Sequence, residues 1–156
     1  MGIRDVYNRI FNRATPEGVV EQQVISRSEH GLSRQKLSEN ALKVLYRLKK
    51  KGFSSYLVGG GVRDVLLDMP TKDFDIATDA TPEEINRMFV NSRIIGRRFR
   101  LVHIMFKDEI IEVSTFRAGQ RSRSNKRLEM LRSDNTFGSL EDDVFRRDFT
   151  INALYY

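Results

Sequence analysis

Two aspartates separated by a single residue, Asp73 and Asp75, are the residues of this sequence best suited to hold a cation. Along a strand, side chains i and i+2 leave the same face, so both carboxylates point one way while Phe74 points into the core. Two parallel carboxylates raise each other's pKa unless a cation lies between them, and Mg2+ prefers oxygen ligands with room for substrate phosphates. The pair therefore predicts a magnesium site, although an isolated pair of this kind is more often a solvated strand edge.

A glycine turn precedes the acidic pair and is followed by an arginine and an acid, in the order Gly59, Gly60, Gly61, Val62, Arg63 and Asp64. Glycines let the backbone approach a phosphate, and the following helix would offer free N–H groups and the Arg63 cation. The turn is not a P-loop, because no Gly-Lys-Ser/Thr follows, and Asp64 replaces the third glycine of the dinucleotide fingerprint. Together with the acids, it predicts a phosphate cradle that faces a metal site.

Two further parts of the sequence contain charged residues that could belong to the same site. Glu112 lies among β-branched and apolar residues of a strand, where an acid is costly unless it is paired or bound to metal. The alternative is an edge-strand residue that faces water. Arg146, Arg147 and Asp148 either clamp a nucleotide or form an ordinary surface ion-pair network.

An arginine-rich stretch without acids is the candidate RNA contact. Its arginines are Arg93, Arg97, Arg98 and Arg100. Phe99 lies among them, and arginine beside an aromatic ring suits RNA phosphates and base stacking. A solvated strand face is the alternative. His103 is expected to pack or to form a hydrogen bond, because no partner for a histidine-based nucleophile is evident.

The composition fits a soluble globular domain with polyanionic partners. The 156 residues are 40% hydrophobic and 31% charged, and the formal net charge is +6. The absence of cysteine excludes disulfides, zinc–thiolate sites and cysteine nucleophiles. No apolar run approaches the roughly 20 residues of a membrane span, and no apolar signal segment opens the chain, so we expect a cytoplasmic protein without a membrane partner.

The elements expected to position these residues form an α/β (α+β) domain with a mixed, largely antiparallel sheet flanked by helices. We expect residues 1–37 to form an N-terminal arm, partly flexible, and residues 38–156 to form the ordered domain. Ser38 caps the first helix, and Gly52 ends it. The other expected elements are a strand over 53–58, a helix over 62–67, a strand over 73–76, a helix from Pro82, a hairpin of 101–106 with 110–116, a surface loop over 118–135, a short helix after Ser139 and a helix from Asp148.

The sequence stops inside the last expected helix. We therefore expect it to be part of a longer protein and to leave Leu154, Tyr155 and Tyr156 exposed. Exposed apolar side chains of this kind would favour self-association.

Four motifs in order resemble the catalytic head of the class II nucleotidyltransferases, the family of bacterial poly(A) polymerases and tRNA CCA-adding enzymes. The motifs are residues 57–64 (LVGGGVRD), 72–78 (KDFDIAT), 111–117 (IEVSTFR) and 146–154 (RRDFTINAL). Residues 94–103, 32–34 and 38–44 resemble the poly(A) polymerase branch. One alternative is a CCA-adding enzyme. The other is a non-catalytic RNA-binding head, and the intact Asp73 and Asp75 argue against this second alternative.

The resemblance implies transfer of AMP from ATP to the 3′-hydroxyl of RNA, with release of pyrophosphate. Asp73 and Asp75 would hold two Mg2+ ions. Asp148 would be the third catalytic acid, whereas strand geometry alone selects Glu112 as a metal ligand, and both remain candidates. The implied ATP-binding residues are Gly59, Gly60, Gly61, Arg63, Asp64 and Arg147. RNA 3′ ends would be the partner, and base selection would lie in neck and body regions that follow the head and are absent here.

Overall fold

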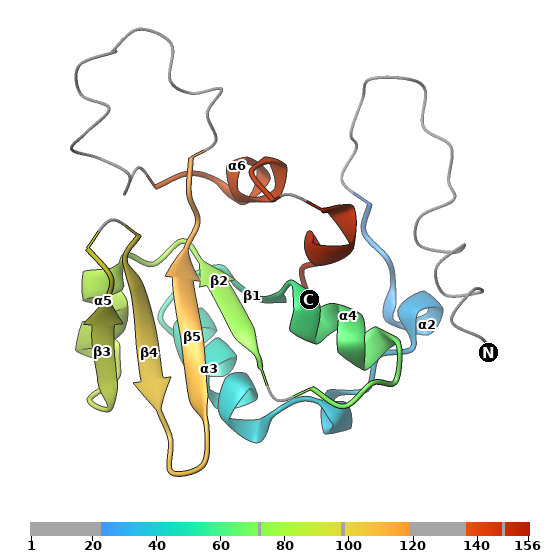
Figure 1. Cartoon of the computed structure of the whole chain (residues 1–156), viewed down its shortest axis with the longest axis horizontal. Coiled ribbons are helices and arrows are strands. Elements are labelled where there is room, and N and C mark those ends of the chain that lie inside the picture. Colours follow the sequence, from blue (N-terminus) through green and yellow to red (C-terminus); the bar gives the residue numbers. More distant parts are fainter. Residues whose placement is uncertain (1–22, 72, 98, 119–136, 148) are drawn as a thin grey trace, which may run out of the picture.

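The computed structural model describes residues 23–71, 73–97, 99–118, 137–147 and 149–156, and Figure 1 gives their arrangement. Its centre is a five-stranded sheet in the order β1-β2-β5-β4-β3. The β2–β5 pairing is parallel and the other three pairings are antiparallel. This arrangement confirms the expected mixed, largely antiparallel sheet. The strands are β1 (Ser55–Val58), β2 (Asp75–Thr78), β3 (Ser92–Ile95), β4 (Leu101–Met105) and β5 (Ile110–Thr115).

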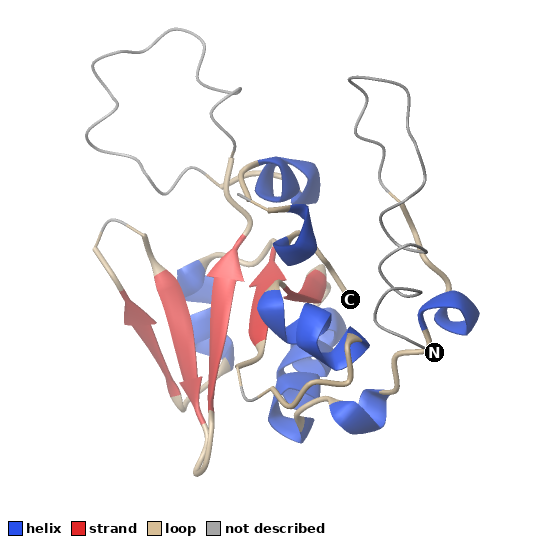
Figure 2. Ribbon diagram, turned by 45° about the vertical axis from the view of Figure 1, so that its right-hand side comes forward, coloured by secondary structure: helices blue, strands red, loops and turns tan. Residues whose placement is uncertain are grey.

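Two helices, α3 (Glu39–Lys50) and α5 (Pro82–Met88), cover the face of the sheet that lies behind it in Figures 1 and 2. Ser38 caps α3 by accepting hydrogen bonds from the N–H groups of Asn40 and Ala41, as the sequence predicts. Thr81 and Glu84 form a capping box at the start of α5. The main hydrophobic core lies between these helices and the strands, and its fully buried side chains include Val44, Leu48, Ile76, Ile85, Val102 and Val113.

The opposite face of the sheet is only partly covered. Near β1 it carries α4 (Gly60–Leu66), α6 (Leu140–Phe145) and the 3-10 turn η3 (Thr150–Asn152). In Figure 1, α6 lies above β1 and β2, and α4 lies to their right. A small second core of Val58, Ala77 and Phe116 lies here. The rest of this face, on β4 and β3, is open to solvent around Arg93 and Met105.

The C-terminal segment corrects the sequence prediction. The expected helix from Asp148 is wrong, because after η3 the chain pairs with the outer edge of β1. The backbone N–H groups of Leu57 and Tyr156 each donate to the other residue's carbonyl at 2.8 Å, and the Gly59 N–H donates to the Leu154 carbonyl at 3.1 Å. A strand edge has unpaired backbone groups, and this pairing satisfies them. The expectation of exposed apolar ends is therefore wrong, since residues 154–156 are all partly buried, and the reason given for self-association is removed with it.

The N-terminal side of the described chain joins the core earlier than expected. A short helix α2 (Arg27–His30) and a 3-10 turn η1 (Arg34–Lys36) precede α3. Leu32 and Leu37 are buried in the main core, so the packed region begins before Ser38. The strand β3 was not predicted, whereas the hairpin of β4 and β5 is confirmed. Residues 1–22 of the expected arm and residues 119–136 of the expected loop lie outside the described residues.

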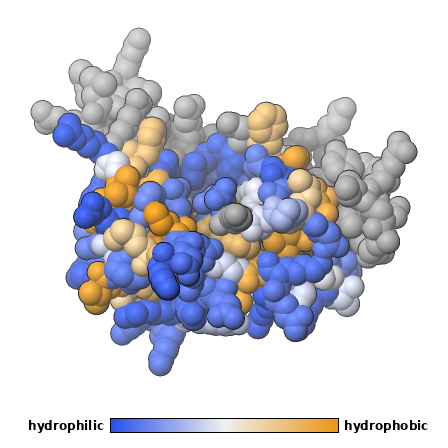
Figure 3. Space-filling view, turned by 60° about the horizontal axis from the view of Figure 1, so that its bottom comes forward, coloured by the Kyte–Doolittle hydropathy of each residue, from blue (hydrophilic) through white to orange (hydrophobic). Residues whose placement is uncertain are grey.

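Hydrophilic side chains cover most of the molecular surface visible in Figure 3, and hydrophobic residues appear there only in scattered places. No described helix is both long and apolar enough to cross a lipid bilayer.

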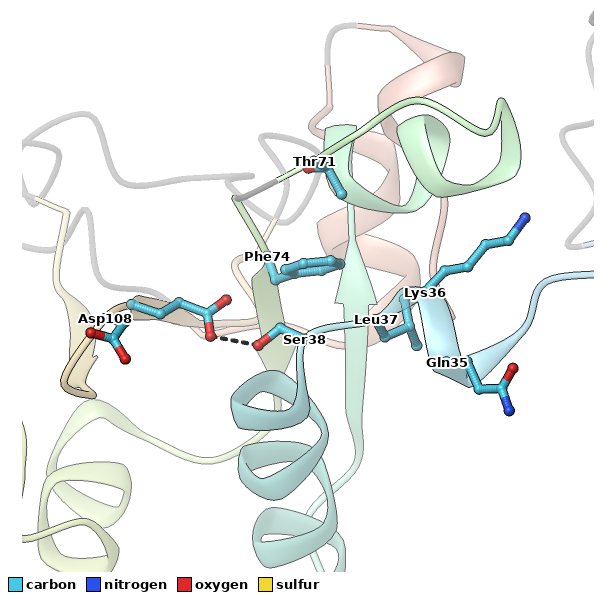
Figure 4. Close-up of a pocket in the computed structure, with 8 residues that line it drawn as sticks. Gln35, Lys36, Leu37, Ser38, Thr71, Phe74 and Asp108 are labelled. Atoms are coloured by element: carbon cyan, nitrogen blue, oxygen red, sulfur yellow. Dashed lines mark hydrogen bonds between the residues drawn. The ribbon is translucent and has the colours of Figure 1, made fainter.

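A pocket of about 440 Å³ opens between the β4–β5 turn and the start of α3, and Figure 4 shows its lining. Its carboxylate Glu109 accepts hydrogen bonds from the Ser38 hydroxyl at 2.5 Å and from the Asn40 amide at 3.1 Å. Phe74 lines this pocket, and Asp73 and Asp75 leave the strand on the other side. The pocket is therefore separate from the acidic pair.

Candidate active site

The strand register places two acids and a histidine side by side on the open face of the sheet. Asp75 of β2 lies opposite Glu112 of β5, and Glu112 lies opposite His103 of β4. Asp73 lies two residues before the start of β2 and is exposed, as is Asp75, while Phe74 between them is buried. This alternation is the one that the sequence predicts.

The electrostatics of this row favour a cation near Asp75. The pKa of the Asp75 carboxyl is raised, first because neighbouring atoms exclude part of its water, and then because Glu112 and Asp73 are like charges. Arg147 acts in the opposite direction. Oxygen ligands that repel one another are a donor set that suits Mg2+, so Asp73 and Asp75 fit the predicted metal.

Glu112 fits a role as a third ligand less directly. Its Oε2 lies 3.3 Å from Nε2 of His103, so it already has a polar partner in a half-exposed position. Among the described residues no group of three acids or histidines is arranged to hold a metal. The prediction for His103, a hydrogen bond rather than catalysis, agrees with this contact. Asp148, the other candidate for the third acid, lies outside the described residues.

The glycine turn adjoins the acids because it follows directly on Val58, the β1 partner of Asp75. Gly59 has φ +73°, a conformation that glycine adopts without strain. A Cβ atom on Gly61 would lie 2.6 Å from the carbonyl oxygen of Asp73. The sequence needs glycine at these positions so that the start of α4 can pack against the segment that carries the acids.

Replacing Gly61 with alanine should destabilise the protein by about 1–3 kcal/mol, because the new methyl group must displace the Asp73 backbone. Gly60→Ala is the matched control, since its Cβ would meet only the flexible Arg63 guanidinium, at 3.4 Å. Chemical denaturation of both variants measures the difference. Equal stability of the two would show that the Gly61 contact is unimportant.

Two arginines lie near the glycine turn, and both are held by protein groups. Arg63 donates to its neighbour Asp64 at 2.8 Å and to the side-chain oxygen of Asn152 at 2.9 Å. A Cβ on Gly59 would lie 3.6 Å from one terminal nitrogen of Arg147. The structure thus brings together Gly59–Gly61, Asp75 and Arg147, while Asp64 serves mainly to hold Arg63.

A buried acid on α6, Asp143, was not singled out by the sequence reasoning. Its side chain has no exposure, and its two oxygens accept hydrogen bonds from four donors. The donors are Arg146 Nε at 2.7 Å, the Tyr155 hydroxyl at 2.6 Å, an Arg147 terminal nitrogen at 3.1 Å and the backbone N–H of Arg117 at 3.3 Å. Burial alone would raise its pKa, but the Tyr155 hydrogen bond and the two arginine charges hold that pKa below its ordinary value.

The candidate RNA-contacting arginines differ in their surroundings. Arg97 is exposed just after β3 and makes no ion pair with the described part of the chain. Arg100 lies 2.5 Å from the carboxylate of Glu83 on α5, so part of its charge is already compensated. Arg98 lies outside the described residues. The prediction of an RNA contact is therefore best supported by position at Arg97.

Comparison with known proteins identifies the class of this fold. A CCA-adding enzyme of Bacillus stearothermophilus, solved in complex with CTP, is similar with a TM-score of 0.61 and 38% identity, covering 74% of this chain and 26% of that one. The sheet with its row of acids is thus that of a nucleotidyltransferase head. Residues 55–156 match the family described as Poly A polymerase head domain, and the chain belongs to this family.

Curated relatives include both branches of the family. Poly(A) polymerase I of Salmonella typhi is 55% identical over 140 residues, which are 85% of this chain and 30% of the relative. The CCA-adding enzyme of Streptococcus uberis is 42% identical over 118 residues, 74% of this chain and 28% of the relative. The chain therefore spans about a third or less of the length of the curated relatives it matches.

Proposed function

We propose that the natural protein containing this head is a polynucleotide adenylyltransferase, which transfers AMP from ATP to the 3′-hydroxyl of RNA and releases pyrophosphate. The observation that carries the proposal is the convergence of Asp73, Asp75, the glycine turn and Arg147 on one side of the sheet. The higher identity to a Poly(A) polymerase I than to a CCA-adding enzyme favours adenylation.

The residues divide into two groups by their chemistry. Asp73 and Asp75 would hold Mg2+, which when bound lowers the pKa of the RNA hydroxyl and neutralises charge on the triphosphate. Gly59, Gly60 and Gly61 let a triphosphate approach the backbone, and the Arg147 guanidinium beside them would attract it. Arg63 would stiffen this turn through its bonds to Asp64 and Asn152.

An incorporation assay with single nucleotides tests the proposal. The natural protein, an RNA primer and Mg2+ are incubated separately with ATP, CTP, GTP or UTP. Extension with ATP by many residues supports polyadenylation. Addition of CTP and then ATP to a tRNA primer, limited to a few residues, would identify a CCA-adding enzyme instead. RNA binding without any extension would leave only the non-catalytic head.

The exposed Arg97 should contribute to RNA affinity through phosphate contact. We expect Arg97→Gln to weaken binding and to reduce the slope of log K against log salt by about one, because one fewer phosphate is neutralised. Arg100→Gln should have a smaller effect, since Glu83 already compensates its charge. Lys50→Gln on α3, behind the sheet, is the control. Filter binding at several salt concentrations measures the slopes, and an unchanged slope for Arg97→Gln would indicate a solvated residue.

A further inference from the structure

The Arg147 guanidinium contacts other protein groups through all three of its nitrogens. Its Nε donates to the Tyr155 hydroxyl at 2.8 Å, one terminal nitrogen lies 3.1 Å from Asp143, and the other lies 3.4 Å from the Asn152 carbonyl. The guanidinium also lies over the Tyr155 ring, 5.1 Å from its centroid. Its side chain is 17% exposed. All three nitrogens therefore have an acceptor. The terminal nitrogen that bonds the Asn152 carbonyl is also the one that faces the glycine turn beside Gly59.

The groups that hold Arg147 are themselves fixed to the strands of the site. Tyr155 forms an isolated antiparallel bridge with Val58, and Val58 pairs with Asp75. The Tyr155 ring packs edge-on against Tyr56 of β1, with centroids 6.1 Å apart. Its hydroxyl donates to the fully buried Asp143 and accepts from Arg147. The position of the Tyr155 hydroxyl is thus tied to the strands that carry the turn and the acid.

These contacts fix the orientation of the Arg147 guanidinium. A guanidinium has five donors in a rigid plane, so two acceptors at Nε and one terminal nitrogen set its orientation. The second oxygen of Asp143 holds Arg146, so the carboxylate cannot rotate without breaking that pair. Preorganised cations act on a triphosphate without a cost of reorientation at binding.

We propose that Tyr155 and Asp143 are positioning residues, which fix the Arg147 guanidinium beside the glycine turn so that it contacts the phosphates of a bound nucleoside triphosphate. This inference rests on the proposed function for its ligand, while the fixed guanidinium is a property of the protein alone. Neither residue touches the ligand, and both act through Arg147.

The test uses the natural protein with ¹⁵N-labelled arginine and two tyrosine variants. In Tyr155→Phe the ring keeps its packing but the hydroxyl is lost. Tyr56→Phe is the matched control, because the Tyr56 hydroxyl makes no hydrogen bond to the described residues although its ring belongs to the same small core. We expect the Arg147 Nε–H signal to be sharp in the wild type and in Tyr56→Phe, and to be broadened in Tyr155→Phe.

Nucleotide kinetics provide the second measurement. Tyr155→Phe should raise the KM for ATP about three- to tenfold with a smaller change in kcat, and this increase should vanish in an Arg147→Gln background. A purely structural role would instead lower the melting temperature and the active fraction without changing KM. Asp143→Asn, which keeps the shape and one acceptor oxygen, is a second variant and should broaden the same signal.

Two results would overturn the positioning role: a sharp Arg147 signal in both Tyr155→Phe and Asp143→Asn, or an equal rise in KM with and without Arg147. If the wild type added no nucleotide, the proposed function would fail, and the NMR comparison would still decide whether Tyr155 and Asp143 fix the guanidinium. If the wild type were active with a sharp Arg147 signal, and both Tyr155→Phe and Asp143→Asn kept that sharp signal, the positioning role would be rejected and the proposed function would stand.

Discussion

Replacing Asp75 with asparagine should reduce AMP transfer by about a thousandfold or more, because a metal-held triphosphate loses several kcal/mol of charge stabilisation. Asp73→Asn should have a similar effect, since Asp73 and Asp75 are both exposed on either side of the buried Phe74. Primer extension by the full natural protein measures the loss. Asp79→Asn, at an exposed acid just after β2, is the control and should extend RNA at the wild-type rate.

The same substitution should leave the fold intact and slightly stabilise the metal-free protein. The pKa of Asp75 is raised in the folded state by partial burial and by Glu112 and Asp73. A carboxyl with a raised folded pKa destabilises the fold once it ionises, so its cost grows as the pH rises from the ordinary aspartate pKa and is fully present above the folded-state pKa. Removing the charge removes the cost.

Magnesium provides the decisive comparison for Asp75. A cation that binds the folded acids raises the melting temperature of the wild type, because ligand binding stabilises the native state. The Asp75→Asn variant should show little of this shift. If Mg2+ stabilised wild type and variant equally, or if the variant extended RNA normally, Asp75 would not belong to the metal site.

The acidic pair and the glycine turn could be predicted from the sequence because both follow from local rules. A strand period of two determines which side Asp73 and Asp75 take, and a run of glycines before a helix indicates close backbone approach. The hairpin of β4 and β5 was equally local, since Lys107, Asp108 and Glu109 separate two apolar runs. These features need no knowledge of distant contacts.

The C-terminal pairing with β1 could not be predicted in the same way. Residues 150–156 contain no turn signal that separates a helix from a strand, and the outcome depends on the free edge of a strand far earlier in the chain. The edge strand β3 was missed for a related reason. Its four residues are too few for a periodic pattern, and the arginines around it were interpreted first as a nucleic-acid contact, with a solvated strand face only as the alternative.

Asp143 was missed although the sequence contains a signal for it. Three consecutive acids open α6, and all three fit the positive end of a helix dipole. Only Asp143 lies three and four residues before Arg146 and Arg147, the spacing of facing side chains on a helix. That spacing would have selected it, but its burial depends on how α6 packs on the sheet, which no local pattern gives.

Replacing Asp143 with alanine should destabilise the protein by about 3–5 kcal/mol, the usual cost of removing one partner from a buried ion pair. The change would leave Arg146, Arg147 and the Tyr155 hydroxyl without their shared acceptor. Glu141→Ala, at an exposed acid in the same turn of α6, is the matched control and should change the free energy of unfolding little. Chemical denaturation at neutral pH measures both variants.

The pH dependence of stability separates the charge of Asp143 from its packing. Because its folded pKa is below the ordinary 3.8, folding releases a proton in this range, and the stabilisation is fully present above about pH 5. It is lost as the pH falls through the folded-state pKa. We therefore expect the wild type to lose stability in this acidic window more steeply than Asp143→Asn, which has no charge to titrate there. Parallel curves for the two proteins would mean that Asp143 stabilises the fold through shape and neutral hydrogen bonds, because a carboxylate paired with two arginines must lose that pairing energy on protonation.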